Sequence, residues 1–155
     1  MKNYLYLIVL FSMIALGIGP GRGGNRANDR KISMSELPSP ARQLLKTYFP
    51  GARVLQCVHS RTWDEYGVKV SGGYELGFDR QGHWEEIESD DKPLSLELVK
   101  LLPAPVVEYL EQHYPGAKVE SMEQRKNVYK ITLVYPDTHL YFSKSGEFVK
   151  ARDDD

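Results

Sequence analysis

The four histidines and the single cysteine are the residues of this chain best suited to chemistry. None of the histidines stands at a spacing that metal sites use, and Cys57 has no second cysteine with which to share a metal or form an internal disulfide. His83 and Glu85, two positions apart on an expected strand, come nearest to a ligand pair. The sequence also has no Gly-x-Ser-x-Gly motif and no phosphate-binding glycine loop. We therefore expect no catalytic residue, no metal site and no cofactor, and we expect that the protein is not an enzyme.

Two acidic runs are a second candidate for chemistry. One extends from Glu85 to Asp91 and the other from Asp153 to Asp155. Carboxylate oxygens suit Ca²⁺, but neither run has the twelve-residue loop with a central glycine that calcium-binding helix pairs use. Solvated acids at strand ends are the simpler interpretation. A small-ligand or calcium sensor stays open as the alternative function.

Aromatic residues on the expected strands favour a binding surface. Trp84 and Phe148 occupy matching positions just after two hairpin glycines, and strict alternation places them on the open face of a sheet together with Trp63 and Tyr141. The alternative is that Trp84 and Phe148 cap the core where their strands begin. Aromatic side chains supply large contact areas at protein interfaces. We therefore predict a non-catalytic module that binds a protein or peptide of the cell envelope, with inhibition as one form of such binding.

The charge pattern narrows the class of partner. The formal net charge is −1, and basic residues are mixed with acidic ones rather than gathered in a stripe. We therefore expect no nucleic-acid partner. If no partner of any kind exists, a structural component of the envelope is the remaining hypothesis.

The helices and strands that position these residues can be predicted from motifs that occur twice in the sequence. Three segments recur at offsets of 65, 65 and 64: Leu37–Pro40 as Leu102–Pro105, Phe49–Val54 as Tyr114–Val119, and Phe78–Trp84 as Phe142–Phe148. A fixed period of this kind indicates a duplicated structural unit.

Each unit is expected to begin with a helix and continue with four strands. Ala41, Leu44 and Leu45 have the spacing of one apolar helical face, Ser39 is a plausible N-cap, and Pro50-Gly51 ends the helix. Alternation and turn residues predict strands at about 53–62, 63–71, 74–78 and 83–89, then 118–124, 128–135, 138–143 and 147–152. The fold class is α+β: a tandem repeat of helix plus four-stranded antiparallel sheet, joined into one continuous eight-stranded sheet with helices on one face.

The amino-terminal segment indicates export. Lys2 is followed by an uncharged apolar run from Tyr4 to Leu16, which is typical of a signal peptide and short for a membrane span. An uncleaved anchor is the alternative. We divide the chain into a signal peptide at 1–19, a flexible linker at 20–31, and repeats at 32–91 and 92–155. The expected location is periplasmic or extracellular, with no membrane association once the leader is removed.

The repeated motifs resemble those of the PepSY-like proteins, also described as beta-lactamase-inhibitor-like, which are common as exported proteins of Bacteroidetes. The resemblance rests on the Leu-Pro-x-Pro helix starts at Leu37 and Leu102, the Pro-Gly-Ala junctions, and the glycine hairpins before Trp84 and Phe148. It implies helices packed on one side of a sheet whose other face is open, and an exported location. The inhibitor itself relies on disulfides, which a chain with one cysteine cannot form, so inhibition of a beta-lactamase is not expected.

Overall fold

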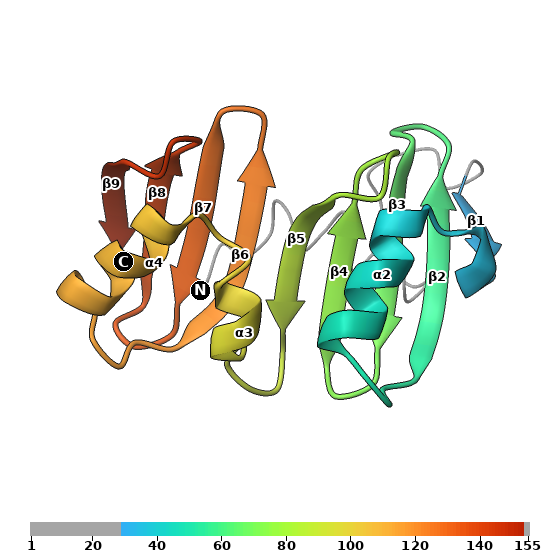
Figure 1. Cartoon of the computed structure of the whole chain (residues 1–155), viewed down its shortest axis with the longest axis horizontal. Helices are drawn as coiled ribbons and strands as arrows, with labels where there is room; N and C mark the ends of the chain where they lie inside the picture. The colour runs from blue at the N-terminus through green and yellow to red at the C-terminus, as the bar shows by residue number, and fades with distance from the viewer. Residues whose placement is uncertain (1–28, 154–155) are drawn as a thin grey trace, which may run out of the picture. The chain divides into compact units, whose positions relative to one another are not determined.

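A computed structural model describes residues 29–153, which form nine strands and four short helices (Figure 1). The elements are β1 (Asp29–Ile32), η2 (Met34–Glu36), α2 (Ser39–Tyr48), β2 (Val54–Ser60), β3 (Glu65–Val70), β4 (Tyr74–Phe78), β5 (Trp84–Ser89), α3 (Leu96–Val99), α4 (Ala104–His113), β6 (Val119–Arg125), β7 (Val128–Leu133), β8 (Thr138–Ser143) and β9 (Phe148–Asp153). The strands follow one another in chain order. The chain divides into two compact units, with the boundary between Trp84 and Glu85.

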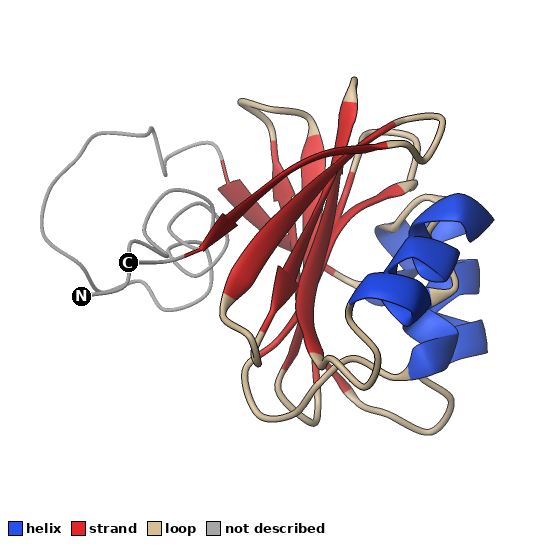
Figure 2. Cartoon of the chain, turned by 90° about the vertical axis from the view of Figure 1, so that its left-hand side faces the viewer, coloured by secondary structure: helices blue, strands red, loops and turns tan. Residues whose placement is uncertain are grey.

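In the first unit, β1 to β4 form antiparallel pairs whose register aligns the core. Ile32 pairs with Cys57, Cys57 with Val68, and Val68 with Leu76, so these side chains share one face of the strands. Val68 and Leu76 are fully buried. Helix α2 lies on one face of these strands (Figures 1 and 2) and contributes the buried residue Ala41.

The second unit repeats this arrangement with β5 to β8 and α4, and adds β9 and α3. Ile87 pairs with Met122, Met122 with Ile131, and Ile131 with Leu140, and all four side chains are fully buried. In this unit the helices lie on one face of the strands, and no helix among the described residues lies on the other face (Figure 2). The α+β class and the tandem helix-and-strand repeat are therefore confirmed.

The structure has one strand more than the eight expected from the sequence. β1 begins at Asp29, inside the segment predicted as a flexible linker, and pairs along its whole length with β2. The short sequence Asp29–Ile32 has little strand signal of its own, because strand formation depends strongly on the neighbouring strand. The predicted signal peptide and most of the predicted linker lie outside the described residues.

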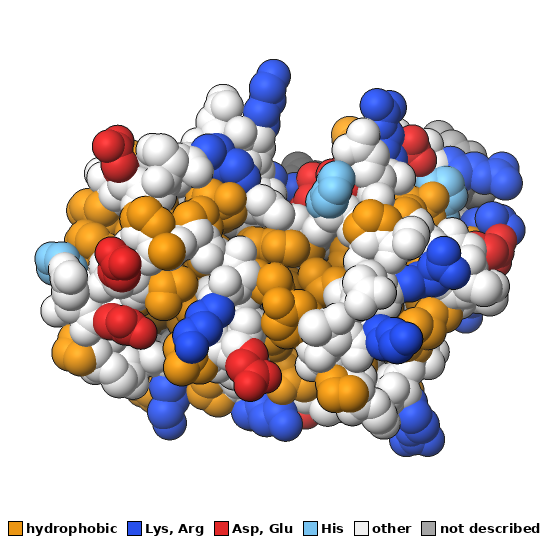
Figure 3. Space-filling model, in the orientation of Figure 1, with side chains coloured by type: hydrophobic (Ala, Val, Ile, Leu, Met, Phe, Trp, Pro, Cys, Tyr) orange, Lys and Arg blue, Asp and Glu red, His pale blue; other side chains and the backbone are white. Residues whose placement is uncertain are grey.

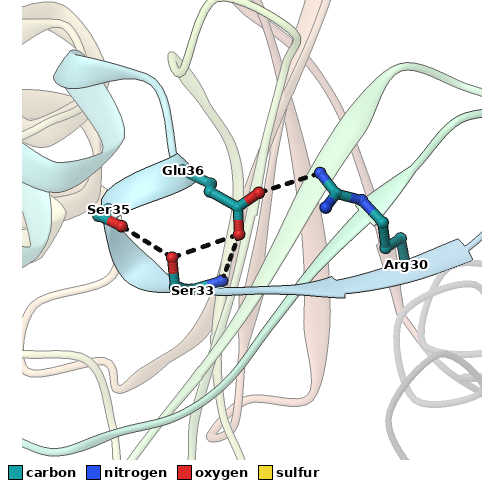
Figure 4. A network of polar contacts seen from close by, with 4 residues as sticks. All are labelled: Arg30, Ser33, Ser35 and Glu36. Carbon is teal, nitrogen blue, oxygen red and sulfur yellow. Dashed lines mark hydrogen bonds and ion pairs between the residues drawn. The ribbon is translucent and has the colours of Figure 1, made fainter.

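A polar network joins β1 to the turn that leads into α2 (Figure 4). The Ser33 backbone N–H donates to the Glu36 carboxylate at 2.9 Å, and Arg30 donates to the other oxygen of the same carboxylate at 3.1 Å. The hydrogen bond from the Ser33 backbone, together with Arg30, lowers the pKa of Glu36. The network therefore holds the end of β1 against the η2 turn.

Helix α2 begins one residue earlier than expected, and α4 begins in the same way. Pro38 and Pro103 occupy the N-cap positions, so Ser39 is the first helical residue of α2 rather than its cap. A second proline, Pro40 or Pro105, lies in the first turn of each helix, where the missing N–H costs nothing. No helix among residues 29–153 is long and apolar enough to cross a membrane.

Candidate functional site

The tryptophans predicted for a binding surface lie in different environments. Trp63 is in the turn between β2 and β3, and 64% of its surface is exposed. Trp84 begins β5 and is only 9% exposed. Trp84 is therefore a buried residue rather than part of an accessible aromatic surface.

Phe148 lies on the helix side of β9 and not on the open face, so its predicted position is wrong. Its ring stacks on Tyr109 of α4, with centroids 4.7 Å apart and planes 7° from parallel, and meets the buried Phe142 edge-on. The cause is a register shift in the pairing of β8 with β9: Tyr141 pairs with Lys150, but Phe142 pairs with Phe148. The extra residue, Val149, reverses the alternation on which the prediction depended.

Tyr141 lies on the face of β8 opposite the helices, since its neighbours Leu140 and Phe142 are fully buried on the helix side. It pairs with Lys130 on β7 and with Lys150 on β9. The Lys150 Nζ atom is 4.9 Å from the centre of the Tyr141 ring, within the range of a cation–π interaction. Tyr141 thus occupies a position between two lysines.

The same register defines a larger surface on the second unit, which we call the polar face. It consists of the side chains that alternate with the core positions of β5 to β9: Glu86, Glu88, Ser121, Glu123, Lys130, Thr132, His139, Tyr141, Lys150 and Arg152. Lys130 pairs with Glu123 at 3.4 Å, and the Thr132 hydroxyl is 3.1 Å from Nδ1 of His139. The polar face therefore carries linked charges of both signs beside an aromatic ring.

Carboxylates gather at the β5–β6 end of the polar face. Glu86 is directly opposite Glu123, and Glu123 and Glu88 are only 5% and 8% exposed. Burial, followed by the charges of Glu123 and Glu88, raises the pKa of Glu86 to about 8. This shift favours the protonated form of Glu86, and a protonated carboxyl group can donate a hydrogen bond as well as accept one.

The corresponding surface of the first unit has glycines where the second unit has a lysine and a tyrosine. Where the second unit pairs Lys130 with Tyr141, the first pairs Gly67 with Gly77. Lys69 and Glu75 form an ion pair on the same face. The two copies thus share their core positions and differ where the side chains face away from the helices.

The sequence predicted that Tyr141 lies on the open face, but it did not predict which residues lie beside it. The pairing of Glu86 with Glu123, and of Lys130 with Tyr141, depends on strand register, which the sequence repeat does not specify. Of the candidate ligand pair His83 and Glu85, His83 has its Nδ1 atom 3.3 Å from the Asp79 carboxylate. Within the described part of the chain, no group of three His, Cys, Asp or Glu residues is arranged to hold a metal ion.

Comparison with known proteins identifies a family whose model matches this chain. A family model described as "Putative beta-lactamase-inhibitor-like, PepSY-like" matches residues 26–79 and 64–150. No protein with curated annotation matches the chain.

Solved structures from Bacteroides share the fold. A Bacteroides thetaiotaomicron protein described as a "putative calcium-regulated periplasmic protein" matches with a TM-score of 0.74 and 26% identity, covering 82% of this chain and 98% of that one. A Bacteroides vulgatus protein, described as a "putative periplasmic protein of unknown function", matches with a TM-score of 0.72 and 26% identity, covering 81% and 99%. Since the family model spans both repeats, the chain belongs to the PepSY-like, beta-lactamase-inhibitor-like family.

Proposed function

We propose that this chain is an exported, non-catalytic protein that binds a protein or peptide partner through the polar face of its second unit. The observation that carries the proposal is the position of Tyr141 between Lys130 and Lys150, on a helix-free face that also holds Glu86 and Glu123. An aromatic ring among charges of both signs suits a protein interface, where charge complementarity selects the partner.

Two further findings support an exported location. The sequence begins with the pattern of a signal peptide. The similar structures from Bacteroides thetaiotaomicron and Bacteroides vulgatus are both described as periplasmic. A partner would accordingly be a component of the cell envelope.

The test is capture of a partner followed by direct measurement. Proteins recovered from an envelope extract by the mature wild type would be identified, purified and titrated against the wild type and a Tyr141→Ala/Lys130→Glu variant. We expect the double change to weaken binding at least tenfold, which is typical of losing an interface anchor. Lys100→Glu, at an exposed lysine after α3, is the matched charge control and should bind normally. Equal affinity for all three proteins would contradict a role for the polar face.

A calcium-responsive protein is the second candidate, favoured by the 26% identical neighbour described as calcium-regulated. The paired carboxyl groups of Glu86 and Glu123 are the ones that would respond, because a bound cation would displace the proton from Glu86. Titration with Ca²⁺ should then raise the melting temperature of the wild type and not of Glu123→Gln. An unchanged melting temperature in the wild type would reject calcium binding.

A further inference from the structure

A pocket of about 370 Å³ opens on the helix side of the second unit, away from the polar face. Its walls come from α3, α4 and the ends of β6 and β7. The apolar residues that matter most are Leu94, Val99, Val107, Leu110, Val119 and Leu133. Its volume lies within the range of roughly 300–1,000 Å³ in which protein cavities hold ligands.

The pocket depends on α3, which has no full counterpart in the first unit. The backbone N–H of Leu94 donates to the carbonyl of Val119 at 2.8 Å, which fixes the approach to α3 against β6. Ser95 caps α3 by accepting from the Leu98 N–H. In the first unit a single 3₁₀ turn, η2, precedes the long helix. The pocket therefore depends on helix α3, which is present in the second unit and replaced by a 3₁₀ turn in the first.

The mouth of the pocket combines apolar surface with two opposite charges. Leu96 lines the pocket and is 57% exposed. Glu111 and Lys118 also line it and are exposed, and neither forms an ion pair with another residue in the described part of the chain. Figure 3 shows hydrophobic side chains at the surface over α3 and α4, with isolated acidic and basic side chains among them.

We propose that this pocket binds a short apolar peptide segment, whose bulky side chains fill the cavity while a positive and a negative group face Glu111 and Lys118. Charge complementarity selects this ligand class. A fatty acid would pair with Lys118 and leave Glu111 without a partner charge, and a cationic amphiphile would pair with Glu111 and leave Lys118 without one. A dipolar peptide satisfies both charges at once. The site lies on the opposite side of the strands from the polar face and does not depend on the function proposed for that face.

Trileucine is a suitable probe because its ammonium and carboxylate termini flank an apolar body. Binding would be followed by NMR of leucine and valine methyl groups in the mature protein. We expect saturable shifts at the methyl groups of Leu96, Val99 and Leu110. Acetylated trileucine and trileucine amide, which each lack one charge, should bind about twofold to fivefold more weakly, the effect of one exposed ion pair. No saturable shift at millimolar trileucine, or tighter binding of decanoate than of trileucine, would overturn the proposal.

Two variants locate the site. Ala117→Trp fills the pocket from its lining and should abolish the shifts, whereas Ala52→Trp at the equivalent position of the first unit should leave them unchanged. Glu111→Lys changes only an exposed residue, so it keeps the test valid if Ala117→Trp fails to fold. The wild type should bind the two derivatives with similar affinity, whereas Glu111→Lys should bind acetylated trileucine, which keeps its carboxylate, more tightly than the amide. Equal affinity of Glu111→Lys for the two derivatives, or shifts retained in a folded Ala117→Trp protein, would contradict this site.

Discussion

Gly82 lies so close to Pro38 that a Cβ atom on the glycine would be 2.7 Å from the proline Cβ. It has a φ of +88°, and the same added carbon would be 3.1 Å from the backbone nitrogen of Ala41. The hairpin before β5 is therefore packed directly against the start of α2. Only glycine satisfies both the left-handed backbone and the close approach.

Replacing Gly82 with alanine should destabilise the protein strongly. We expect Gly82→Ala to lower the free energy of unfolding by about 2–4 kcal/mol, since backbone strain and overpacking act together. Gly51→Ala is the matched control: its φ of +75° is similar, but nothing lies within 4 Å of the added carbon. That change should cost about 1–2 kcal/mol. Chemical denaturation of both variants would check the difference, and equal losses would show that the contact with Pro38 is unimportant.

The second copy provides an independent version of this prediction. A Cβ on Gly146, where φ is +91°, would lie 2.9 Å from the Cβ of Pro105. Gly146→Ala should therefore destabilise the protein by about 2–4 kcal/mol, and Gly116→Ala, with φ +75° and open space around it, by about 1–2 kcal/mol. Urea unfolding of the two variants would measure this. A smaller loss for Gly146→Ala than for Gly116→Ala would contradict the shared design of the two repeats.

These contacts explain what the sequence could and could not predict. The Leu-Pro-x-Pro and hairpin-glycine motifs recur at nearly the same offset, and this spacing was enough to predict the repeat and the fold class. The structure adds that the two motifs touch in each unit. β1 was missed because its strand character comes from pairing with β2. The face of Phe148 was predicted wrongly because one extra residue in β9 reverses the alternation. The polar face and the helix-side pocket depend on strand register and helix packing, which a single sequence does not specify.

The matched aromatic residues Trp84 and Phe148 should contribute unequally to stability. Trp84 is 9% exposed, whereas Phe148 is 41% exposed even though it stacks on Tyr109. We expect Trp84→Ala to cost about 3–5 kcal/mol, as for a buried aromatic residue, and Phe148→Ala about 1–2 kcal/mol. Thermal and urea unfolding would rank the two variants. A larger loss for Phe148→Ala would mean that the aromatic stack contributes more than burial of the tryptophan.

Cys57 should be unreactive in the folded protein. Its side chain is 5% exposed, and burial raises the pKa of the thiol, so little reactive thiolate forms. A thiol reagent should therefore label Cys57 at the rate of unfolding in the native protein and at once in urea. Cys57→Ala should lose about 1–2 kcal/mol from the reduced core packing, measured by urea unfolding. Rapid labelling of the native protein would contradict the burial of this side chain.

The carboxyl pair formed by Glu86 and Glu123 should make stability fall as the pH rises. Burial and the neighbouring charges of Glu123 and Glu88 raise the pKa of Glu86 from 4.5 to about 8, against the smaller opposing effects of Arg125 and Lys130. Below pH 4.5, Glu86 carries its proton in both the folded and the unfolded chain. Between pH 4.5 and about pH 8, only the folded chain keeps this proton, so the free energy of unfolding decreases as the pH increases.

Glu86→Gln should remove this pH dependence, because the amide resembles the protonated carboxyl group and cannot ionise. From about pH 5 to about pH 8 the wild type should lose up to about 4 kcal/mol through this group, and the variant should be the more stable protein at the higher pH. Urea unfolding at both pH values would test this, with Glu147→Gln as the control because Glu147 is an exposed carboxylate of the same unit. The control should follow the wild-type profile. If Glu86→Gln follows it as well, Glu86 ionises in the folded protein as it does in the unfolded chain, and the carboxylates at the β5–β6 end of the polar face are far better solvated than their burial indicates.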